Sequence, residues 1–497
     1  MLAGVQLLVG DVFRRNALQV PDQVAASLGE AALTHRELDR AANQVARALR
    51  GLGVARGDRV LGWADTSLDI LPVFAALSKL GAAFAPMNAR LGADEAAQVA
   101  PLARAKLLVA DAERAEAGAE LAKATGVPAF ARVGGGRGPG TLLDAAALDE
   151  SDADVDEPGL REDDPHVVFF TSGSTGRPKG VVLSHRANWL RTFQGVFRDV
   201  PERSVCMFPL FHMAAFTLAL TAWQTHGEIA FVKSPTAEAL LAAVERRRGN
   251  RLYGIPAVWA RILETPPGRF DTSSLRELDT GTSATPVELV QALKQRFPGT
   301  ATRIYYGSTE CGSATTLADA DVLRKPGSVG PPSPGVELRL SDEGEIQVKS
   351  PYLMSGYFDD PAATEAALRD GWYRTGDLGA LDADGYLSVV GRLREVIRTG
   401  GESVVPAEVE RELAAHPAVA EVAVVGIPDP QWGEVVCAVV VPRAGARISL
   451  EELRRHCAGR LAGFKQPRRL ECVDSLPRTA ATGQVQRRLL VERIGAR

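Results

Sequence analysis

The sequence predicts an α/β protein with mainly parallel sheets, built as a large multi-layered N-terminal domain and a small α+β C-terminal domain. Short apolar runs at 60–63, 229–232 and 422–425 indicate buried strands, and longer amphipathic segments lie between such runs. This alternation is typical of layered α/β folds. The chain has 497 residues, of which 45% are hydrophobic, so it is long enough for roughly three domain-sized cores.

The helices are predicted from capping signals at their N-termini. Thr34 and Glu37 form a T-x-x-E capping box, apolar residues follow at helical spacing, and glycines at 51 and 53 end the segment. We therefore expect a helix over 34–50. The same signal opens expected helices at 285–288 and 449–452.

Composition excludes several functional classes. A net charge of -4 and a pI near 6.1 give no field that would gather nucleic acid or an anionic membrane. The five cysteines contain no C-x-x-C pair, so neither a disulfide framework nor a zinc site is expected. The N-terminus lacks a signal-peptide pattern, and the apolar stretch 70–87 is interrupted by Lys79 and Gly81. We expect a soluble, cytoplasmic protein without a membrane span.

Two places are predicted as boundaries. Residues 133–165 are rich in Gly, Asp, Glu and Pro, which indicates an exposed connection. A new pattern of strand, helix and strand begins after the run 386–390. We place a hinge near Arg394, which gives domains at 1–393 and 394–497.

The segment 171–180, TSGSTGRPKG, lies between apolar runs at 167–170 and 181–183. Its glycines allow consecutive backbone N–H groups to turn toward one anion, and its hydroxyls and cations add donors and charge. This composition predicts a phosphate cradle, whereas the alternative, a flexible Gly/Ser linker, explains the glycines but not the hydroxyls. The donors, cations and glycines are Thr171, Ser172, Gly173, Ser174, Thr175, Gly176, Arg177, Lys179 and Gly180.

The ten residues closely resemble the signature loop of the adenylate-forming superfamily, which includes AMP-forming acyl-CoA ligases, peptide-synthetase adenylation domains and luciferases. In that family the loop grips the triphosphate of ATP. The resemblance covers nearly the whole chain and implies that the small C-terminal domain is mobile. Further matching motifs are PLFHMAAF at 209–216, GTSA at 281–284, YGSTE at 306–310, TGDL at 375–378 and GGES at 400–403.

The resemblance implies roles for the nucleotide and for Mg²⁺. Tyr306 would stack on adenine, Thr309 would touch the α-phosphate and Glu310 would hold Mg²⁺, which prefers one or two carboxylates together with phosphate oxygens. Asp377 would bind the ribose hydroxyls, and Arg392 would also reach the nucleotide. The other residues assigned to the nucleotide site are Gly281, Thr282, Gly307 and Ser308, with Lys179 as a catalytic group and Thr171 as a second metal ligand.

An acyl site is expected around His212, which in the superfamily borders the acyl pocket. The neighbours of His212 are uncharged, so we expect an apolar or neutral acid. A packed core histidine is the alternative. The residues assigned to the substrate are His212, Met213, Ala214, Tyr253, Gly307 and Cys311.

Gly400 and Gly401 resemble the family glycines that line the pantetheine tunnel of coenzyme A. Backbone without side chains suits a narrow tunnel. A β-turn before the next helix is compatible with the same residues. The phosphopantetheine of a carrier protein could take the place of coenzyme A.

The chain departs from the family near its C-terminus. The superfamily pattern is P-R-T-x-x-G-K, and its lysine bridges the acyl carboxylate and the α-phosphate during adenylation. Here one extra residue lies between Arg478 and Gly483, and the neutral Gln484 stands where the lysine is expected. Losing one preorganised group of this kind typically costs about 10²- to 10³-fold in rate. Attack of a thiol on a finished acyl-AMP does not build up the same charge.

Three interpretations remain open. The first is an acyl-CoA ligase whose adenylation is slowed by Gln484 or rescued by another cation such as Lys465 or the pair Arg487 and Arg488. The second is a half-enzyme that takes acyl-AMP from a partner adenylating enzyme and makes only the thioester. The third is a catalytically silent protein that binds acyl-adenylate or coenzyme A. Retention of Lys179 and Glu310 argues against the third.

Overall fold

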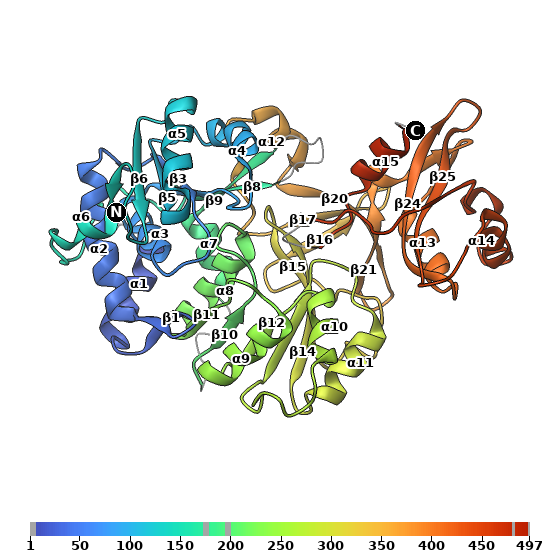
Figure 1. Cartoon of the computed structure of the whole chain (residues 1–497), viewed down its shortest axis with the longest axis horizontal. Helices are drawn as coiled ribbons and strands as arrows, with labels where there is room; N and C mark the ends of the chain where they lie inside the picture. Colours follow the sequence, from blue (N-terminus) through green and yellow to red (C-terminus); the bar gives the residue numbers. More distant parts are fainter. Residues whose placement is uncertain (1–5, 172–177, 194–199, 480–482, 496–497) are drawn as a thin grey trace. The chain divides into compact units, whose positions relative to one another are not determined.

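The computed structural model describes residues 6–171, 178–193, 200–479 and 483–495. The chain divides into two compact units (Figure 1). The first consists of Met1–Pro326, Ser333–Glu337 and Lys349–Tyr373, and the second of Gly327–Pro332, Leu338–Val348 and Arg374–Arg497. The boundary that we placed at 393/394 falls inside the second unit and stays a prediction.

One sheet of the first unit has eight strands in the order β18-β9-β8-β4-β3-β5-β6-β7. Its strands from β8 to β7 run parallel, whereas β9 pairs antiparallel with both β8 and β18. The strands are β3 (Arg59–Trp63), β4 (Ala83–Pro86), β5 (Leu107–Asp111), β6 (Ala129–Val133), β7 (Thr141–Leu142), β8 (Pro165–Thr171), β9 (Lys179–Ser184) and β18 (Gly356–Tyr357).

The other sheet of this unit has the order β15-β14-β13-β12-β10-β11-β1-β2. It is parallel from β14 to β1 and has an antiparallel strand at each edge. The strands are β1 (Val24–Leu28), β2 (Ala31–Thr34), β10 (Arg203–Cys206), β11 (Glu228–Phe231), β12 (Arg251–Tyr253), β13 (Glu277–Gly281), β14 (Ala301–Ser308) and β15 (Gly312–Leu317).

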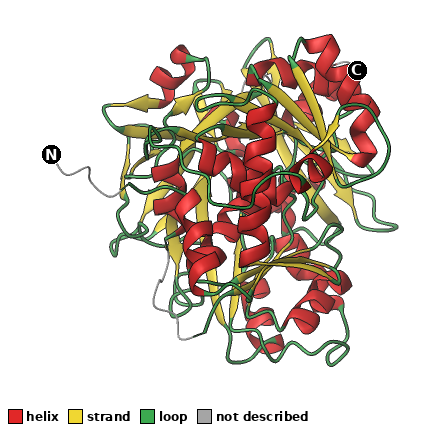
Figure 2. Cartoon of the chain, turned by 90° about the vertical axis from the view of Figure 1, so that its left-hand side faces the viewer, coloured by secondary structure: helices red, strands yellow, loops and turns green. Residues whose placement is uncertain are grey.

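Helices pack among the sheets of the chain, which confirms the predicted α/β class (Figure 2). The capping box of Thr34 and Glu37 is formed at the start of α2, whereas α11 begins after Pro286 without a side-chain cap. No helix in the described ranges is long and apolar enough to cross a membrane. The helices of the first unit are α1 (Gly10–Gln19), α2 (His35–Gly51), α3 (Ile70–Leu80), α4 (Ala93–Val99), α5 (Ala115–Thr125), α6 (Leu143–Leu148), α7 (His185–Thr192), α8 (Met213–Gln224), α9 (Ala237–Arg247), α10 (Pro256–Glu264), α11 (Val287–Arg296) and α12 (Pro361–Ala367).

Two further sheets, each of five strands, lie mainly in the second unit. One has the order β16-β17-β20-β19 with β21 beside β20, and its strands are β16 (Glu337–Leu340), β17 (Glu345–Lys349), β19 (Leu368–Arg369), β20 (Trp372–Leu381) and β21 (Leu387–Arg392). The other sheet has the order β23-β22-β25-β24 with β26 beside β25, and it has an apolar core on each face. Its elements are β22 (Ile397–Thr399), β23 (Glu402–Val404), β24 (Val419–Asp429), β25 (Gly433–Pro442), β26 (Arg469–Cys472), α13 (Pro406–Ala414), α14 (Leu450–Cys457) and α15 (Arg487–Gly495).

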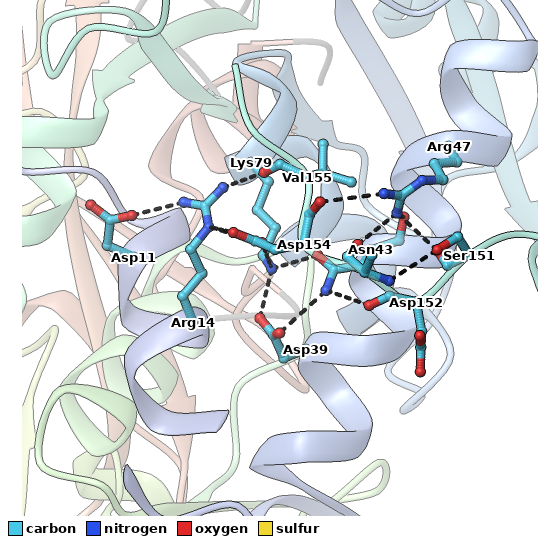
Figure 3. A network of polar contacts seen from close by, with 11 residues as sticks. Asp11, Arg14, Asp39, Asn43, Arg47, Lys79, Ser151, Asp152, Asp154 and Val155 are labelled. Atoms are coloured by element: carbon cyan, nitrogen blue, oxygen red, sulfur yellow. Dashed lines mark hydrogen bonds and ion pairs between the residues drawn. The ribbon is translucent and has the colours of Figure 1, made fainter. Parts of the chain in front are cut away.

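A buried lysine anchors the irregular segment that follows α6. The side chain of Lys79 on α3 is fully buried, and its Nζ lies 2.7 Å from Asp39 Oδ1 and 3.0 Å from Asp154 Oδ1. It also donates to Asn43 Oδ1 at 2.6 Å. Arg14 of α1 holds the other oxygen of Asp154, at 2.8 Å (Figure 3). Lysine is rarely buried unless it is paired, and these carboxylates supply the pairing.

Side chains of α2 hold the backbone of the same segment. Arg47 donates to the carbonyl oxygens of Ser151 and Ala153, and Asn43 donates to that of Asp152. These bonds satisfy backbone groups that have no helix or strand partner. The stretch 133–165, predicted as an exposed connection, contains β7 and α6. The residues after α6 are hydrogen-bonded to side chains of α2.

We predict that Lys79→Met lowers the free energy of unfolding by about 3 kcal/mol, because the largely buried Asp39 carboxylate loses its compensating charge, whereas Asp154 keeps Arg14. The exposed Lys123 of α5 supplies a matched control, since Lys123→Met should change stability by no more than about 0.5 kcal/mol. Urea denaturation of both variants measures the difference. A loss at Lys79 no larger than at Lys123 would contradict the anchoring role.

Candidate active site

The predicted phosphate cradle joins two paired strands. β8 and β9 form an antiparallel hairpin in which Thr171 lies opposite Lys179. A Cβ atom on Gly180 would lie 2.9 Å from Val168 Cγ1, so the strands approach closely beside the loop. The assigned residues Ser172, Gly173, Ser174, Thr175 and Gly176 lie outside the described residues, and their roles stay predictions.

Lys179 and Glu310 are connected through one aromatic side chain. Lys179 Nζ lies 4.7 Å from the centroid of the Tyr357 ring, and the Tyr357 hydroxyl donates to Glu310 Oε1 at 3.1 Å. Tyr357 is on β18, which pairs with β9 so that Tyr357 stands opposite Val181. The hairpin cation and the predicted metal carboxylate are thus brought together, although they are far apart in the sequence.

A buried arginine, Arg191, donates hydrogen bonds to the turn that carries Glu310 and to the neighbouring segment at Tyr352. Arg191 of α7 is 4% exposed, and its guanidinium donates to the carbonyl oxygens of Thr309 at 3.1 Å and Tyr352 at 2.6 Å. Met354 N–H donates to the carbonyl oxygen of Glu310 at 2.7 Å. Burial lowers the pKa of Arg191 to about 10, which still leaves it charged at neutral pH. The turn is therefore fixed from both sides.

Ser308, Cys311 and Gly307 complete the turn. Ser308 Oγ lies 3.4 Å from Cys311 Sγ, and burial raises the pKa of the Cys311 thiol to about 11. A protonated thiol is a poor nucleophile, so Cys311 contributes shape here. A Cβ atom on Gly307 would lie 1.9 Å from the carbonyl oxygen of Gly312, so this position requires glycine.

The motif at 281–284 lies beside the motif at 306–310. β13 and β14 are parallel neighbours with Gly281 opposite Tyr305, so their carboxyl ends meet at one edge, where α/β sheets bind ligands. Tyr306 follows on β14. Thr282 has a φ of 67°, which is a strained value for a β-branched residue. Such strain clusters at functional sites.

His212 begins the helix of the expected acyl site. Its Nδ1 accepts from the backbone N–H of Ala214 at 3.2 Å, so His212 caps α8, whose first residue is Met213. The His212 ring stacks on Phe208 at 5.4 Å, and the Tyr253 ring meets Phe208 edge-on at 5.4 Å. Burial lowers the pKa of His212 to about 4, so the imidazole is neutral at pH 7. His212 is part-buried at the start of α8, and its role toward a substrate stays a prediction.

Two predicted nucleotide ligands of the second unit contact each other. Asp377 and Arg392 are register partners on β20 and β21, and Arg392 Nε lies 2.7 Å from Asp377 Oδ1. Asp377 is 8% exposed, and its N–H donates to Thr375 Oγ1. The guanidinium orients this carboxylate.

Gly400 and Gly401 form the two-residue turn of a hairpin. Thr399 pairs with Glu402, and the glycines have φ of 60° and 84°, values that glycine adopts without strain. A Cβ atom on Gly400 would lie 2.7 Å from the ring of Trp432. The turn that was open as an alternative is therefore present, and a tunnel-lining role is compatible with it.

Gln484 lies at the base of a short loop. The Gln484 N–H donates to Thr479 Oγ1 at 3.1 Å, and its carbonyl oxygen accepts from the Thr479 N–H at 2.8 Å. The backbones of Arg478 and Val485 form an isolated antiparallel β-bridge. The side chain of Gln484 is exposed. Residues 480–482, which include the extra residue, lie outside the described part of the chain.

Glu310 suits a hydrated cation better than a dedicated metal cage. No cluster of three or more His, Cys, Asp or Glu side chains able to hold a metal occurs among the described residues. Mg²⁺ often binds one carboxylate and completes its shell with phosphate oxygens and water. Because Tyr357 engages Oε1 of Glu310, the carboxylate keeps a second oxygen, and the donor set fits Mg²⁺ bound together with a nucleotide.

The two-unit α/β fold, with a hairpin loop, a strand-end carboxylate and an Asp–Arg pair, is typical of adenylate-forming enzymes. The AMP-binding enzyme family model matches residues 13–358, and the model of its C-terminal domain matches 408–482. The chain belongs to the AMP-binding enzyme family and is, by class, an AMP-forming acid–CoA ligase.

Similar proteins are found along nearly the full chain. A feruloyl-CoA synthase of Amycolatopsis is 38% identical, with 95% of this chain and 97% of that protein covered. An indoleacetate–CoA ligase of Aromatoleum aromaticum is 35% identical, with 94% of each covered. The crystal structure of ATP-bound MatB from Rhodopseudomonas palustris superimposes with a TM-score of 0.88 at 30% identity, covering 97% of this chain and 98% of that one.

The pH dependence of stability tests whether His185, at the start of α7, is buried in its neutral form. His185, the first residue of α7, is fully buried and accepts from the backbone N–H of Val9 at 3.3 Å. Burial lowers the pKa of His185 to about 4. The unfolded chain therefore binds more protons between about pH 4 and 6.5, and stability rises with pH across that window.

We predict that stability falls by up to about 3 kcal/mol for His185 as the pH drops from 6.5 to 4. His185→Gln should flatten this part of the profile, because glutamine does not titrate. Denaturation at several pH values between 4 and 7.5 measures both proteins. An identical pH dependence in the two would show that His185 is not held neutral by the fold.

Proposed function

We propose that the chain is an acyl-CoA ligase whose thioester-forming step is intact and whose adenylation step is slowed because Gln484 takes the place of the lysine. Adenylation brings a carboxylate onto the α-phosphate of ATP and releases pyrophosphate. A cation offsets the like-charge repulsion that grows toward that transition state. The neutral Gln484 supplies no such charge. In the second step a thiol attacks the acyl carbon and AMP leaves, without a new approach of two anions.

The observation that carries this proposal is the pairing of the neighbouring cations in the sequence. Arg487 Nη1 lies 3.0 Å from Glu395, and Arg487 Nη2 lies 2.8 Å from Glu410. Lys465 Nζ binds both oxygens of Glu408, at 2.7 and 2.8 Å. Each cation is already compensated by carboxylate charge, so replacing the lysine by either would first require breaking an ion pair.

Arg478, beside the Gln484 loop, is engaged in the same way. Its Nη2 lies 2.5 Å from Glu421 Oε2, and its Nη1 donates to the carbonyl oxygen of Gly483. This supports a structural role in closing the loop. Arg488 pairs with Glu492 one turn along α15.

The remaining site residues suit nucleotide binding. Lys179 would meet the phosphates beside the hairpin loop, Tyr306 the adenine, and Asp377 the ribose hydroxyls through its two acceptor oxygens. Mg²⁺, held by Glu310 and by Thr171 of β8, would neutralise phosphate charge. Gly400 and Gly401 would admit the pantetheine of coenzyme A or of a carrier protein.

We propose a neutral, ring-bearing monocarboxylic acid as the substrate. The His212 and Tyr253 rings each contact the Phe208 ring, and His212 is neutral, so the expected acyl site offers aromatic surface without charge. The names of the two sequence relatives above, feruloyl-CoA synthase and indoleacetate–CoA ligase, are in keeping with such an acid.

The half-enzyme that takes acyl-AMP from a partner is the extreme case of the same proposal, in which the adenylation rate is zero. It requires that Gln484 abolishes adenylation entirely, whereas the ligase requires only that adenylation is slow. A silent binding protein would have no use for the linked Lys179 and Glu310. The assay that follows separates the three, because they differ in which half-reaction is measurable.

We predict that the unmodified protein converts synthetic acyl-AMP and coenzyme A to the thioester far faster than it converts acid, ATP and coenzyme A. Gln484→Lys should raise the ATP-dependent rate by up to about 10²- to 10³-fold and leave the acyl-AMP route nearly unchanged. Exposed Gln431, changed to lysine, is the matched control for added charge in the same unit. Acid-dependent ATP–pyrophosphate exchange reports adenylation alone.

Rapid exchange by the unmodified protein would contradict a slowed adenylation step. Absence of thioester from acyl-AMP would instead leave only the silent protein. The comparison of the acyl-AMP route with the ATP route in the unmodified protein carries more weight than the Gln484→Lys variant. The extra residue between Arg478 and Gly483 could displace the loop, and a displacement of about 1 Å can keep a new lysine from its target.

We predict that each CH₂ added to the acid improves binding by up to about 0.8 kcal/mol until the site is filled. Neutral aromatic monocarboxylates should therefore be preferred to dicarboxylates of equal length. Competition among acyl-AMP analogues in the thioester assay measures the preference. Stronger competition by short dicarboxylates would contradict a neutral site.

A further inference from the structure

We infer that Tyr357 is a positioning residue for nucleotide binding: its ring seats the ammonium of Lys179 and its hydroxyl fixes the carboxylate of Glu310. Both contacts are direct, with the ammonium 4.7 Å from the ring centroid and the hydroxyl 3.1 Å from Glu310 Oε1. The inference rests on the proposed function only for the roles of Lys179 and Glu310 toward ATP.

The backbone of Tyr357 is fixed before any ligand binds. β18 pairs with β9, and the Tyr357 N–H donates to Thr364 Oγ1 of α12 at 2.8 Å. Thr364 Oγ1 also donates to the carbonyl oxygen of Asp360 at 2.8 Å. A Cβ atom on Gly356 would lie 2.8 Å from Thr364 Cγ2, so α12 closes tightly over this short strand. The phenol therefore projects from a rigid base, as preorganised positioning requires.

The Tyr357 hydroxyl is the donor in its hydrogen bond with Glu310. A phenol has one O–H to donate and an ordinary pKa of about 10, so it carries its proton at neutral pH. Hydrogen bonds to an ionised group are stronger than those between neutral groups, so this bond orients Glu310 effectively.

One side chain serves both charges without cancelling either. The face of an aromatic ring attracts a cation through its quadrupole and carries no net charge. The phenol donates to one carboxylate oxygen and leaves the other accessible. In a direct ion pair, the charges of Lys179 and Glu310 would neutralise each other. Neither charge would then be available to bind phosphate or a cation. Tyr357 supplies the third member that holds both groups in place.

The test separates the hydroxyl from the ring. Tyr357→Phe keeps the ring and removes the donor to Glu310, whereas Tyr357→Met removes both. Binding of ATP with and without Mg²⁺, and of AMP without Mg²⁺, is measured by isothermal titration calorimetry. The control is Tyr352→Phe, which removes a phenol that donates to the carbonyl oxygen of Ser313.

Tyr357→Phe should weaken ATP binding about tenfold in the presence of Mg²⁺ and leave AMP binding within about twofold, because Glu310 loses a partner. The variant also removes the hydrogen bond between the Tyr357 and Tyr373 hydroxyls, a loss that the Glu310→Gln background shares and therefore separates. Tyr357→Met should also weaken ATP binding without Mg²⁺, by about threefold, through loss of the seat of Lys179. Tyr352→Phe should change none of these affinities. In a Glu310→Gln background, Tyr357→Phe should have no further effect on Mg²⁺-dependent binding.

An equal loss from Tyr357→Phe in the wild-type and Glu310→Gln backgrounds would overturn the inference, because the hydroxyl would then not act through Glu310. Unchanged ATP affinity in both Tyr357 variants would overturn it as well. Neither result would touch the proposed function, which is judged by thioester formation and pyrophosphate exchange. Thermal unfolding of each variant identifies any loss that comes from the fold.

Discussion

The buried guanidinium of Arg191 is the constraint on which the candidate active site of the first unit depends. It joins α7 to the turn at Thr309 and to the segment at Tyr352, each through a backbone carbonyl. Burying a charge is costly, and the two hydrogen bonds to carbonyl dipoles offset part of that cost. Because Arg191 fixes both segments, Glu310 and Tyr357 meet in one arrangement.

Charge is handled differently in the two units. In the first unit, Lys179 and Glu310 contact the same neutral phenol and keep their charges for a ligand. In the second unit, Lys465, Arg478 and Arg487 are each matched by glutamate. The proposed defect in adenylation follows from this contrast. The cations near Gln484 in the sequence are each paired with a glutamate, so none is free to replace the missing lysine without breaking an ion pair.

Much of the fold and part of the site could be predicted from local sequence. The capping box of Thr34 marks α2, the apolar runs around 171–180 mark a strand pair, and the motifs mark the strand ends at Gly281 and Glu310. These features are encoded within about ten residues. The contacts of Arg191 and Tyr357 could not be predicted, because they join segments far apart in the sequence. Arg191 meets segments more than a hundred residues away, and Tyr357 meets Glu310 at a separation of 47 residues. The fastening of 149–156 to α2 was missed for the same reason, since its donors lie on another element.

The central claim is that the charge missing at Gln484 slows adenylation and leaves thioester formation intact. The most direct measurement starts from protein loaded with acyl-AMP and offers coenzyme A and pyrophosphate together at saturating concentrations. Return to ATP passes through the adenylation transition state in reverse, so it needs the same cation. We expect thioester to exceed ATP by at least about 10²-fold in a single turnover. Comparable amounts of ATP and thioester would contradict it.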